Sequence, residues 1–427
     1  TRITHDFFAD RVEDLKPILD SDASDSASLD AAFEILLQTD RSLPMTKSMI
    51  IPESWSNNND MPDELKKMYA YCNAVIEPWD GPAAVCANFG DWIISGMDRN
   101  GLRPLRYIIT GDDLLISGSE VGMVIVDDRN ILKKGRVGPG ELIAINYKEK
   151  KFYQSDELKK QLAKENPYAD WNKNTILLDE ILEKQSATKP NNDNLENSKV
   201  ISKYFNYTIE VLDLILDPMA ISGQEALGSM GDDTPLSVLT DNYRGLHTFF
   251  KQNFAQVTNP PIDSLREQIV MSLKTRLGNL GNIADADADQ LNLVLLESPV
   301  LLDHELESLK LHLEKNTTEI DCTYAKDLNK NFLQEIQRIC SEAETAVRSG
   351  SQHIILTDKN INENRISLPM ILITSAVHNY LIKNQLRTFT SLNVSSKECL
   401  DVHYFAVLIG VGATTVNASL VESLIFE

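Results

Sequence analysis

The sequence has few cysteines, and their spacing fits neither a disulfide framework nor a metal site. The five are Cys72, Cys86, Cys322, Cys340 and Cys399, which are widely spread and form no CxxC pair. Small disulfide-rich secreted domains and zinc or iron–sulfur sites need paired or clustered cysteines. We therefore expect a protein of a reducing compartment, the cytosol.

Basic residues are scarce as well. Lys and Arg number 41 against 63 Asp and Glu, which leaves a net charge of -22. Binding to nucleic acid or to an anionic membrane needs dense Lys and Arg. No apolar run reaches the length of a membrane span, and no signal-peptide pattern is found. The sequence thus predicts a cytoplasmic location, with neither nucleic acid nor a membrane as partner.

What the sequence does contain is enough apolar residues for sizeable cores. With 427 residues, 42% of them hydrophobic, the chain is long enough for two or three domains. Apolar residues recur at helical spacing in residues 26–40 and 63–78. Short apolar runs follow at 91–97, 106–110, 114–120, 123–132 and 141–155, with hairpin turns expected at 111–113 and 148–150. Helices followed by hairpins predict an α+β N-terminal lobe.

The second half of the chain has helical and then alternating patterns. Residues 184–200 carry almost nothing apolar, so we expect a mobile loop, although an insertion within a domain fits equally well. Helical patterns follow in residues 208–219 and 265–278, and in the charged stretch 303–348 at residues 304–316 and 328–347. The C-terminal part then reads as strand, helix, strand and helix at residues 353–358, 368–386, 389–394 and 402–416. This order predicts an α/β domain with βαβ units and parallel strands.

Four blocks of residues occur in the order typical of one enzyme family. They are SDSASLD at 24–30; IPESW, EPWDGPAA and MDRNGLRPLRY between 51 and 107; GSMGDDTPLSVL at 228–239; and FAQVTNPPIDSLREQIVMSL at 254–273. With these blocks the sequence resembles the large subunit of glutamate synthase. Members of this family hydrolyse glutamine and deliver the ammonia internally to 2-oxoglutarate, which is reduced to glutamate.

The resemblance implies two domains. Residues 1–172 would be the C-terminal half of a class II glutaminase domain, with part of the αββα layers of an Ntn-type fold. Residues 173–427 would be the central domain, which joins the glutaminase to an FMN-binding barrel. FMN and an iron–sulfur cluster serve the full-length family enzyme, and we expect neither in this chain. The implied partners are the missing N-terminal glutaminase segment and the C-terminal FMN domain, and a eukaryotic parent would also fit a plastid.

The resemblance further implies that this chain alone is inactive. Glutamine hydrolysis in the family uses an N-terminal cysteine thiolate, its α-amino group as base, an Asn-Gly oxyanion hole and an arginine for the substrate carboxylate. In the family all of these precede the SDSASLD block, so we expect no catalytic residue among residues 1–427. What remains is Asp25, which matches the aspartate that holds the α-amino group of glutamine. The alternative role for Asp25 is to cap the helix that begins near Ala27.

Two further segments match parts of the family that connect its domains. Residues 228–234, including Met230, match the place where the central and glutaminase domains meet. Their glycines and acids fit neither a phosphate loop nor a calcium loop. Thr258 and Asn259 match the segment near the entrance of the ammonia tunnel, where two prolines would hold the wall rigid. An ordinary rigid turn between domains is an equal alternative for this last segment.

Five other side chains invite a catalytic assignment that we do not favour. Arg99, Arg103 and Arg106 could clamp an anion, but arginines in a hairpin turn more often pair with neighbouring carboxylates. Cys72 and Cys86 are candidate nucleophiles, yet each lies in an apolar pattern where cysteine packs as a small hydrophobe. We therefore expect structural roles for all five.

Two other functions stay open at this stage. One is a non-catalytic module that uses Asp25 and its pocket to bind an amino acid. The other is a different truncated class II amidotransferase, for example of the purine type, although no phosphoribosyl-diphosphate motif is found. Residues 393–406 also depart from the Glu-Thr-Gly and paired-histidine pattern of the family, and His353, His378 and His403 lie too far apart in sequence to propose a metal triad.

Overall fold

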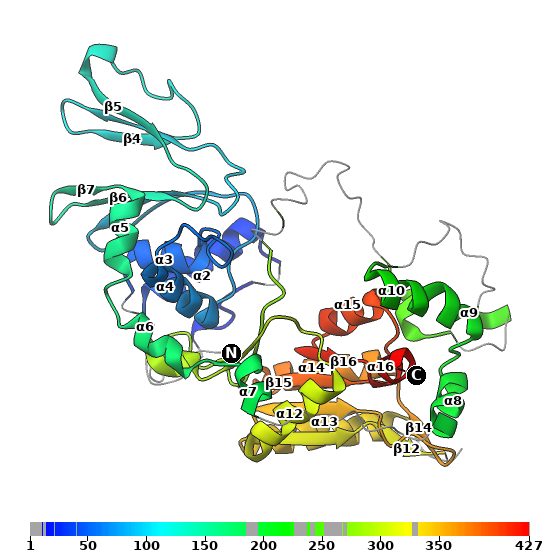
Figure 1. Ribbon diagram of the computed structural model, residues 1–427. Helices are drawn as coiled ribbons and strands as arrows, with labels where there is room; N and C mark the ends of the chain where they lie inside the picture. The colour runs from blue at the N-terminus through cyan, green and yellow to red at the C-terminus, as the bar shows by residue number, and fades with distance from the viewer. Residues whose placement is uncertain are drawn as a thin grey trace. The chain divides into compact units, whose positions relative to one another are not determined.

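The computed structural model describes residues 11, 14–20, 22–39, 41–184, 195–225, 237–239, 244–251, 267, 271–326 and 332–426 (Figure 1). The chain forms two compact units, both of mixed α/β structure. Unit 1 comprises Thr1–Thr175, Val257–Ser272 and Leu280–Asn292, and unit 2 comprises Ile176–Gln256, Leu273–Asn279 and Leu293–Glu427. Within the described ranges, no helix is both long and apolar enough to cross a membrane.

Unit 1 combines helices with two antiparallel sheets. Its helices are α2 (Asp25–Leu37), α3 (Leu43–Ile50), α4 (Asp63–Val75), α5 (Ser155–Leu162) and α6 (Tyr168–Trp171), with 3-10 turns at Asp128–Asn130, Asn172–Asn174 and Ala288–Leu291. The first sheet has the order β1-β2-β6-β7 and the second the order β4-β3-β5. The strands are β1 (Ala84–Phe89), β2 (Trp92–Met97), β3 (Arg106–Thr110), β4 (Leu115–Gly118), β5 (Ile131–Arg136), β6 (Leu142–Asn146) and β7 (Lys151–Tyr153).

Both hairpins expected in unit 1 are confirmed, as are the helices expected at 26–40 and 63–78. β3 pairs antiparallel with β4, and β6 pairs antiparallel with β7. Asp113 and Lys150 in the two turns have φ values of 62° and 55°. Tight hairpin turns require such left-handed residues, because they match the twist of the paired strands.

One expected strand of unit 1 is wrong over most of its length. Residues 123–126 lie outside any strand, and β5 begins only at Ile131. The Asp127 carboxylate accepts a hydrogen bond from the Arg129 N–H, which caps a 3-10 turn at Asp128–Asn130. This local side-chain bond interrupts the extended run, because it offers the backbone an alternative to a sheet ladder.

The first sheet of unit 1 is covered on both faces. On one face lies α3, which is buried along its whole length and contacts β1 and β2. The other face packs against the second sheet through Met97, Ile143 and Tyr107. Two apolar interfaces, one on each face of the first sheet, therefore stabilise unit 1.

Unit 2 is built around a parallel sheet of the order β11-β13-β15-β16. Its strands are β11 (Thr317–Asp321), β13 (His353–Thr357), β15 (Ser391–Ser395) and β16 (Thr415–Asn417), joined through α13 (Phe332–Arg348), α14 (Met370–Lys383) and α15 (Val402–Gly410). Two smaller sheets contain β8 (Ile176–Leu177), β10 (Val294–Leu296) and β9 (Thr275–Leu277), and β12 (Thr323–Ala325) and β14 (Arg365–Ser367). The expected βαβ units with parallel strands are confirmed.

The remaining helices of unit 2 are short. They are α7 (Leu178–Lys184), α8 (Leu195–Tyr204), α9 (Ile209–Val211), α10 (Asp217–Ser222), α12 (Asp303–His312) and α16 (Ser419–Phe426), with a π-helical turn at Leu212–Leu216 and 3-10 turns at Ser237–Leu239, Leu246–Phe249, Glu314–Asn316 and Arg387–Phe389. α9, the π-helical turn and α10 run on from one another, as the helical pattern of residues 208–219 predicts.

Alternate residues of β13 pack into two different apolar clusters, one on each face of the sheet. Ile354 and Leu356 belong to the large apolar cluster with α13, α14 and α15, whereas Ile355 packs with Leu306 and Leu309 of α12. Successive side chains of a strand point to opposite faces of the sheet. A strand buried on both faces reads as a continuous apolar run, and this explains why residues 353–358 predict a strand.

The two helices expected within the stretch 303–348 are confirmed as α12 and α13. β11 and β12 lie between them, because the β-branched run Thr317–Asp321 pairs with β13. The helix expected at 402–416 stops at Gly410, and β16 follows. Gly412 has a φ of 120°, a conformation that a helix cannot contain and that glycine tolerates.

Two other expectations concern segments of which the structure describes only a part. Residues 195–200 of the expected loop begin α8, because Ile201 and Phe205 reach the core four residues apart. Residues 185–194 lie outside the described part of the chain. In the helix expected at 265–278, Thr275–Leu277 instead form β9, which pairs with β10. Residues 265–266 and 268–270 of that stretch are also outside the described part.

Candidate functional site

Asp25 lies at the first turn of α2 with an exposed side chain. The helix is capped by its neighbour Ser24, whose Oγ accepts a hydrogen bond from the Ala27 N–H at 3.3 Å. The capping role considered for Asp25 is therefore wrong. The Asp25 carboxylate makes no hydrogen bond or ion pair with another described residue, so it is available to a cationic ligand group.

The other three residues expected at a site cannot be placed. Met230, Thr258 and Asn259 all lie outside the described residues. Their assignment to the interdomain region and to the ammonia tunnel stays a prediction from the resemblance.

The MDRNGLRPLRY block is a turn organised around Asp98. The Asp98 carboxylate is buried and accepts hydrogen bonds from the backbone N–H groups of Asn100, Leu102, Arg103 and Ala83, at 3.0–3.2 Å. This role was not predicted from the sequence. An aspartate two residues before an Asn-Gly pair, as in Asp98-Arg99-Asn100-Gly101, favours side-chain hydrogen bonding to the following backbone and would have indicated this role.

Of the three arginines in the same block, only one pairs with a carboxylate among the described residues. Arg99 forms an ion pair with Asp80, with 3.1 Å between Nη2 and Oδ1. The side chains of Arg103 and Arg106 are exposed and form no ion pair with another described residue. The structural role that we favour is therefore confirmed for Arg99 alone.

Behind this turn lies the buried amine of Lys47, which comes from α3. Its Nζ donates hydrogen bonds to the carbonyl oxygens of Ile51, Gly140 and Glu141, at 3.0, 3.1 and 3.5 Å. Burial lowers the pKa of Lys47 to about 7, and repulsion from Lys159 acts in the same direction. An ammonium without water is costly unless each N–H finds an acceptor.

The surroundings of Lys47 show that its role is structural. A Cβ on Gly96 of β2 would lie 2.8 Å from Cε of Lys47, so a side chain at position 96 would have to displace the buried lysine. Lys159, also buried, pairs with Glu53 at 2.9 Å, and the Tyr69 hydroxyl donates to the same carboxylate oxygen at 3.0 Å. Lys47 thus ties α3 to the loop before β6.

Neither cysteine of unit 1 has the surroundings of a nucleophile. Cys72 is buried in α4, and burial raises the pKa of its thiol to about 12, which keeps it protonated. Cys86 is exposed, so the expectation that it packs in the core is wrong. The reason is that β1 is an edge strand of its sheet. The Cys86 Sγ lies 3.2 Å from the Ser95 hydroxyl, and a serine hydroxyl is a poor base.

Unit 2 has a second buried carboxylate, Asp358, directly after β13. Both of its oxygens accept hydrogen bonds from the Lys397 N–H, at 3.0 and 2.9 Å, and one also accepts from the Ser396 hydroxyl at 3.3 Å. Burial raises the pKa of Asp358 to about 7, although the hydrogen bond from Lys397 opposes this shift. The carboxyl ends of parallel strands are where α/β proteins commonly bind ligands.

Here the carboxyl ends are occupied by the chain itself. Glu398 accepts a hydrogen bond from the Met370 N–H, at the start of α14, at 3.1 Å. The Tyr207 hydroxyl donates to the carbonyl oxygens of Lys397 and Glu398. The loop after β15 thus joins β13, α14 and the residues after α8.

The histidines of unit 2 do not gather into a metal site. His353 is buried, its Nδ1 lies 2.9 Å from the Ser391 hydroxyl, and burial lowers its pKa to about 4. His378 accepts a hydrogen bond from Arg387 at 3.0 Å. Across the described residues, no group of three or more His, Cys, Asp or Glu could hold a metal ion.

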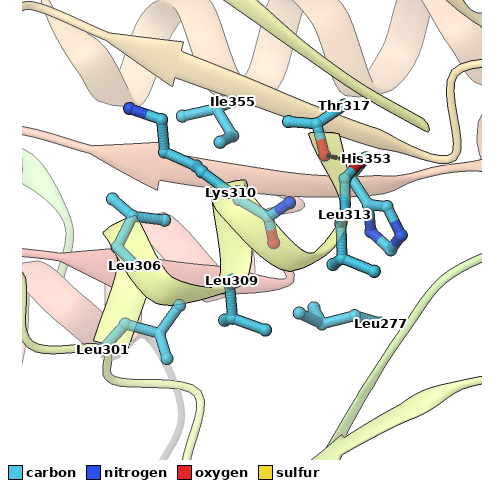
Figure 2. A pocket seen from close by; sticks show the side chains of 10 residues that line it. Leu277, Leu301, Leu306, Leu309, Lys310, Leu313, Thr317, His353 and Ile355 are labelled. Atoms are coloured by element: carbon cyan, nitrogen blue, oxygen red, sulfur yellow. Dashed lines mark hydrogen bonds between the residues drawn. The ribbon is translucent and has the colours of Figure 1, made fainter. Parts of the chain in front are cut away.

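One small pocket of unit 2 lies beside His353 (Figure 2). Its walls are leucines of α12 and its surroundings, Ile355, Thr317 and the stem of Lys310. The cavity encloses about 10 Å³, roughly the space of one water molecule. Such a cavity is too small for glutamine or 2-oxoglutarate.

The Asp98 turn leads to a stability prediction. Asparagine has one acceptor oxygen and an NH₂ group that cannot accept, so Asp98→Asn would leave several N–H groups unpaired. We expect it to lower the free energy of unfolding by about 2–4 kcal/mol, measured by urea unfolding with tryptophan fluorescence. Asp91→Asn is the control, since Asp91 pairs only loosely with Lys148, at 3.8 Å. Equal stability of the two variants would contradict the role of Asp98.

The raised pKa of Asp358 predicts how stability depends on pH. The pKa is about 7 in the folded state against an ordinary 3.8, so the folded state binds the extra proton between these values. The contribution of Asp358 to stability therefore falls as pH rises from 4 to 7, by up to about 1.4 kcal/mol per pH unit. Asp358→Asn should remove this slope from urea unfolding curves, whereas Asp213→Asn, at an exposed position, should keep it. An unchanged slope in Asp358→Asn would rule the assignment out.

Two protein families match the chain, one after the other. The model described as glutamine amidotransferases class-II matches residues 1–171. The model described as glutamate synthase central domain matches residues 201–427, which is more than half of the chain.

Curated relatives match along nearly the whole chain. The glutamate synthase [NADPH] large chain of Azospirillum brasilense is 50% identical over 430 residues, covering 100% of this chain and 28% of the relative. The large chain of the same name from Bacillus subtilis is 38% identical, covering 97% of this chain and 27% of the relative. The ferredoxin-dependent glutamate synthase of Pyropia yezoensis is 38% identical, with 95% and 26% covered. The chain thus spans little more than a quarter of the length of these relatives, and by its matches it belongs to the glutamate synthase large-chain family.

Proposed function

We propose that this chain is one part of a glutamate synthase large chain. The parent reaction converts glutamine, 2-oxoglutarate and reductant to two glutamates, with ammonia passed internally between two sites. In this proposal residues 1–172 are the C-terminal half of the glutaminase domain and residues 173–427 are the central domain. The observation that carries the proposal is the 50% identity to the Azospirillum brasilense large chain along the whole of this chain.

The fold of unit 1 supports the glutaminase assignment. Helices lie on one face of its first antiparallel sheet and a second antiparallel sheet lies on the other. A helix layer followed by two sheets is part of the αββα order of Ntn-type hydrolases, and we propose that unit 1 contributes these layers. The second helix layer would come from residues other than those described.

In the proposed function Asp25 binds the α-ammonium group of glutamine. Its carboxylate is exposed, makes no bond with another described residue and lies beside a helix N-terminus that Ser24 already caps. An ionised carboxylate accepts charge-assisted hydrogen bonds from an ammonium, which selects an amino acid over a simple amide. Asp25 would orient glutamine while other groups attack its side-chain amide.

We further propose that residues 1–427 do not hydrolyse glutamine by themselves. Glutamine hydrolysis of this type needs a reactive thiolate next to a base. Cys72 is buried with a raised pKa, and Cys86 faces a serine hydroxyl. Neither has a base as hydrogen-bond partner among the described residues.

We assign the cofactors of the parent reaction to other parts of a full-length large chain. No group of three or more possible metal ligands comes together in the described ranges, so an iron–sulfur cluster does not fit there. FMN would supply hydride transfer in the complete enzyme. The N-terminal glutaminase segment and the FMN domain are thus the proposed partners of this chain.

Release of ammonia from glutamine tests the proposed function. The purified chain would be compared with a chimeric large chain, in which these residues replace the matching part of the Azospirillum brasilense enzyme. We expect no ammonia from the chain alone and glutamine-dependent ammonia release from the chimera. A chimera that folds without activity would contradict the proposal, and glutamine binding by the isolated chain in that case would favour a non-catalytic amino-acid-binding module.

The role of Asp25 is tested in the same chimera. Asp25→Asn removes the charge that faces the α-ammonium, and a hydrogen bond to a charged group contributes about 1.5–3 kcal/mol. We expect the KM for glutamine to rise roughly 10- to 100-fold with a smaller change in kcat. The matched control is Asp30→Asn, which removes an exposed carboxylate from the same helix. Equal KM values in both variants would leave Asp25 without the proposed role.

A further inference from the structure

A histidine of α14, His378, receives a hydrogen bond from an arginine. The Nε of Arg387 lies 3.0 Å from the Nδ1 of His378. An arginine Nε always carries a hydrogen, because the guanidinium keeps its charge in proteins. The Nδ1 of His378 is therefore the acceptor, and the bond exists only while this nitrogen is unprotonated. Because histidine titrates near neutral pH, the contact is sensitive to protons.

The other donors of Arg387 hold the turn between α15 and β16. Its Nη2 donates to the Gly412 carbonyl oxygen at 2.9 Å and to the Thr414 hydroxyl at 3.3 Å. Its Nη1 donates to the Thr390 carbonyl oxygen at 2.7 Å. The Thr414 hydroxyl also accepts a hydrogen bond from the Leu392 N–H of β15, at 3.0 Å. The guanidinium of Arg387 thus joins α14, the start of β15 and the turn after α15.

The His378 ring is also in contact with this turn. A Cβ on Gly412 would collide with the ring, so the ring lies directly against the backbone of Gly412. The turn leads into β16, which is an edge strand of its sheet. A change in the charge of the His378 ring therefore acts where this edge strand begins.

Arg387 is the charged group that acts on the His378 ring. Burial lowers the pKa of His378, and repulsion from Arg387 lowers it further. Of the helices packed against α14, α13 presents Glu344, whose carboxylate accepts a hydrogen bond from another residue of α14. α15 carries His403, whose Nε2 bonds with a backbone carbonyl oxygen. The turn after α15 and strand β15 contain no charged side chain.

We propose that His378 and Arg387 form a proton-sensitive latch, which holds the turn between α15 and β16 while His378 is neutral and releases it when His378 is protonated. A protonated Nδ1 cannot accept the hydrogen of the Arg387 Nε, and the two cations repel each other. Mild acid would then loosen β16 ahead of the rest of unit 2. The latch lies within unit 2 and does not depend on the proposed function.

The direction of the pH effect follows from the lowered pKa of His378. The open turn lets His378 titrate at its ordinary pKa of 6.5, whereas the closed latch holds this pKa lower. The open form therefore binds the proton more tightly. The latch is fully closed above pH 6.5, and its contribution is lost as pH falls through the lowered pKa.

Hydrogen exchange at two pH values tests the latch. The Leu392 and Thr414 amides would be followed at about pH 8 and about pH 5 in the chain of residues 1–427. Protection factors are compared, because they correct for the effect of pH on intrinsic exchange. We expect them to fall about tenfold at the lower pH, while the amides of β11 and β13 keep their protection.

Two variants separate the acceptor from the proton. His378→Asn offers an amide oxygen in place of Nδ1 and cannot be protonated, so protection of Leu392 and Thr414 should stay high at both pH values. His378→Phe keeps an aromatic ring without an acceptor, so protection should be low at both. The matched control is His312→Asn, which removes an exposed histidine of α12 and should keep the wild-type difference.

Three results would overturn the latch. The first is equal protection of Leu392 and Thr414 at both pH values in the unchanged chain. The second is a wild-type fall in the His378→Asn variant, because the titrating group would then be another one. The third is a simultaneous loss of protection throughout unit 2 at the lower pH, since this would assign the effect to unfolding of the whole unit.

Discussion

A charged side chain that leaves water must recover its hydrogen bonds, and this constraint organises both units. Lys47 is satisfied by backbone carbonyl groups, and Asp98 and Asp358 by backbone N–H groups. None of these three side chains forms an ion pair within 4.0 Å with another described residue. Their partners are loops, so each buried charge fixes the path of backbone that no sheet or helix would otherwise hold.

The same constraint explains why loops in this chain lie where they do. In unit 1 the Asp98 carboxylate draws the residues of the MDRNGLRPLRY block into one turn, and Lys47 holds the loop before β6 from the other side. In unit 2 Asp358 binds the loop after β15, to which Tyr207 and the start of α14 are attached. The segment 393–406, for which the sequence predicts a departure from the family pattern, therefore contains a loop with a structural task in this chain.

The sequence predicted the elements whose apolar pattern is regular. Residues 353–358 read correctly as a buried strand, and the turns at 111–113 and 148–150 as hairpins, because side-chain period and turn chemistry are local properties. Residues 123–126 were misjudged because the Asp127 carboxylate caps a 3-10 turn and interrupts the extended run, and Cys86 because its strand lies at the edge of a sheet. The strand Thr317–Asp321 was missed because its pairing with β13 is a long-range contact inside a charged stretch. Asp25 was predicted as a site residue from the family resemblance, whereas the burial of Lys47, Asp98 and Asp358 follows only from the folded chain.

The contact between Lys47 and Gly96 has a consequence for what position 96 can accept in this chain. The space that a side chain at position 96 would need is filled by the lysine stem. A larger residue at position 96 would therefore push the lysine stem aside, and that shift would weaken the hydrogen bonds from Nζ to the carbonyl oxygens of Ile51 and Gly140. A glycine that looks dispensable in the sequence is thus matched to an amine on another element.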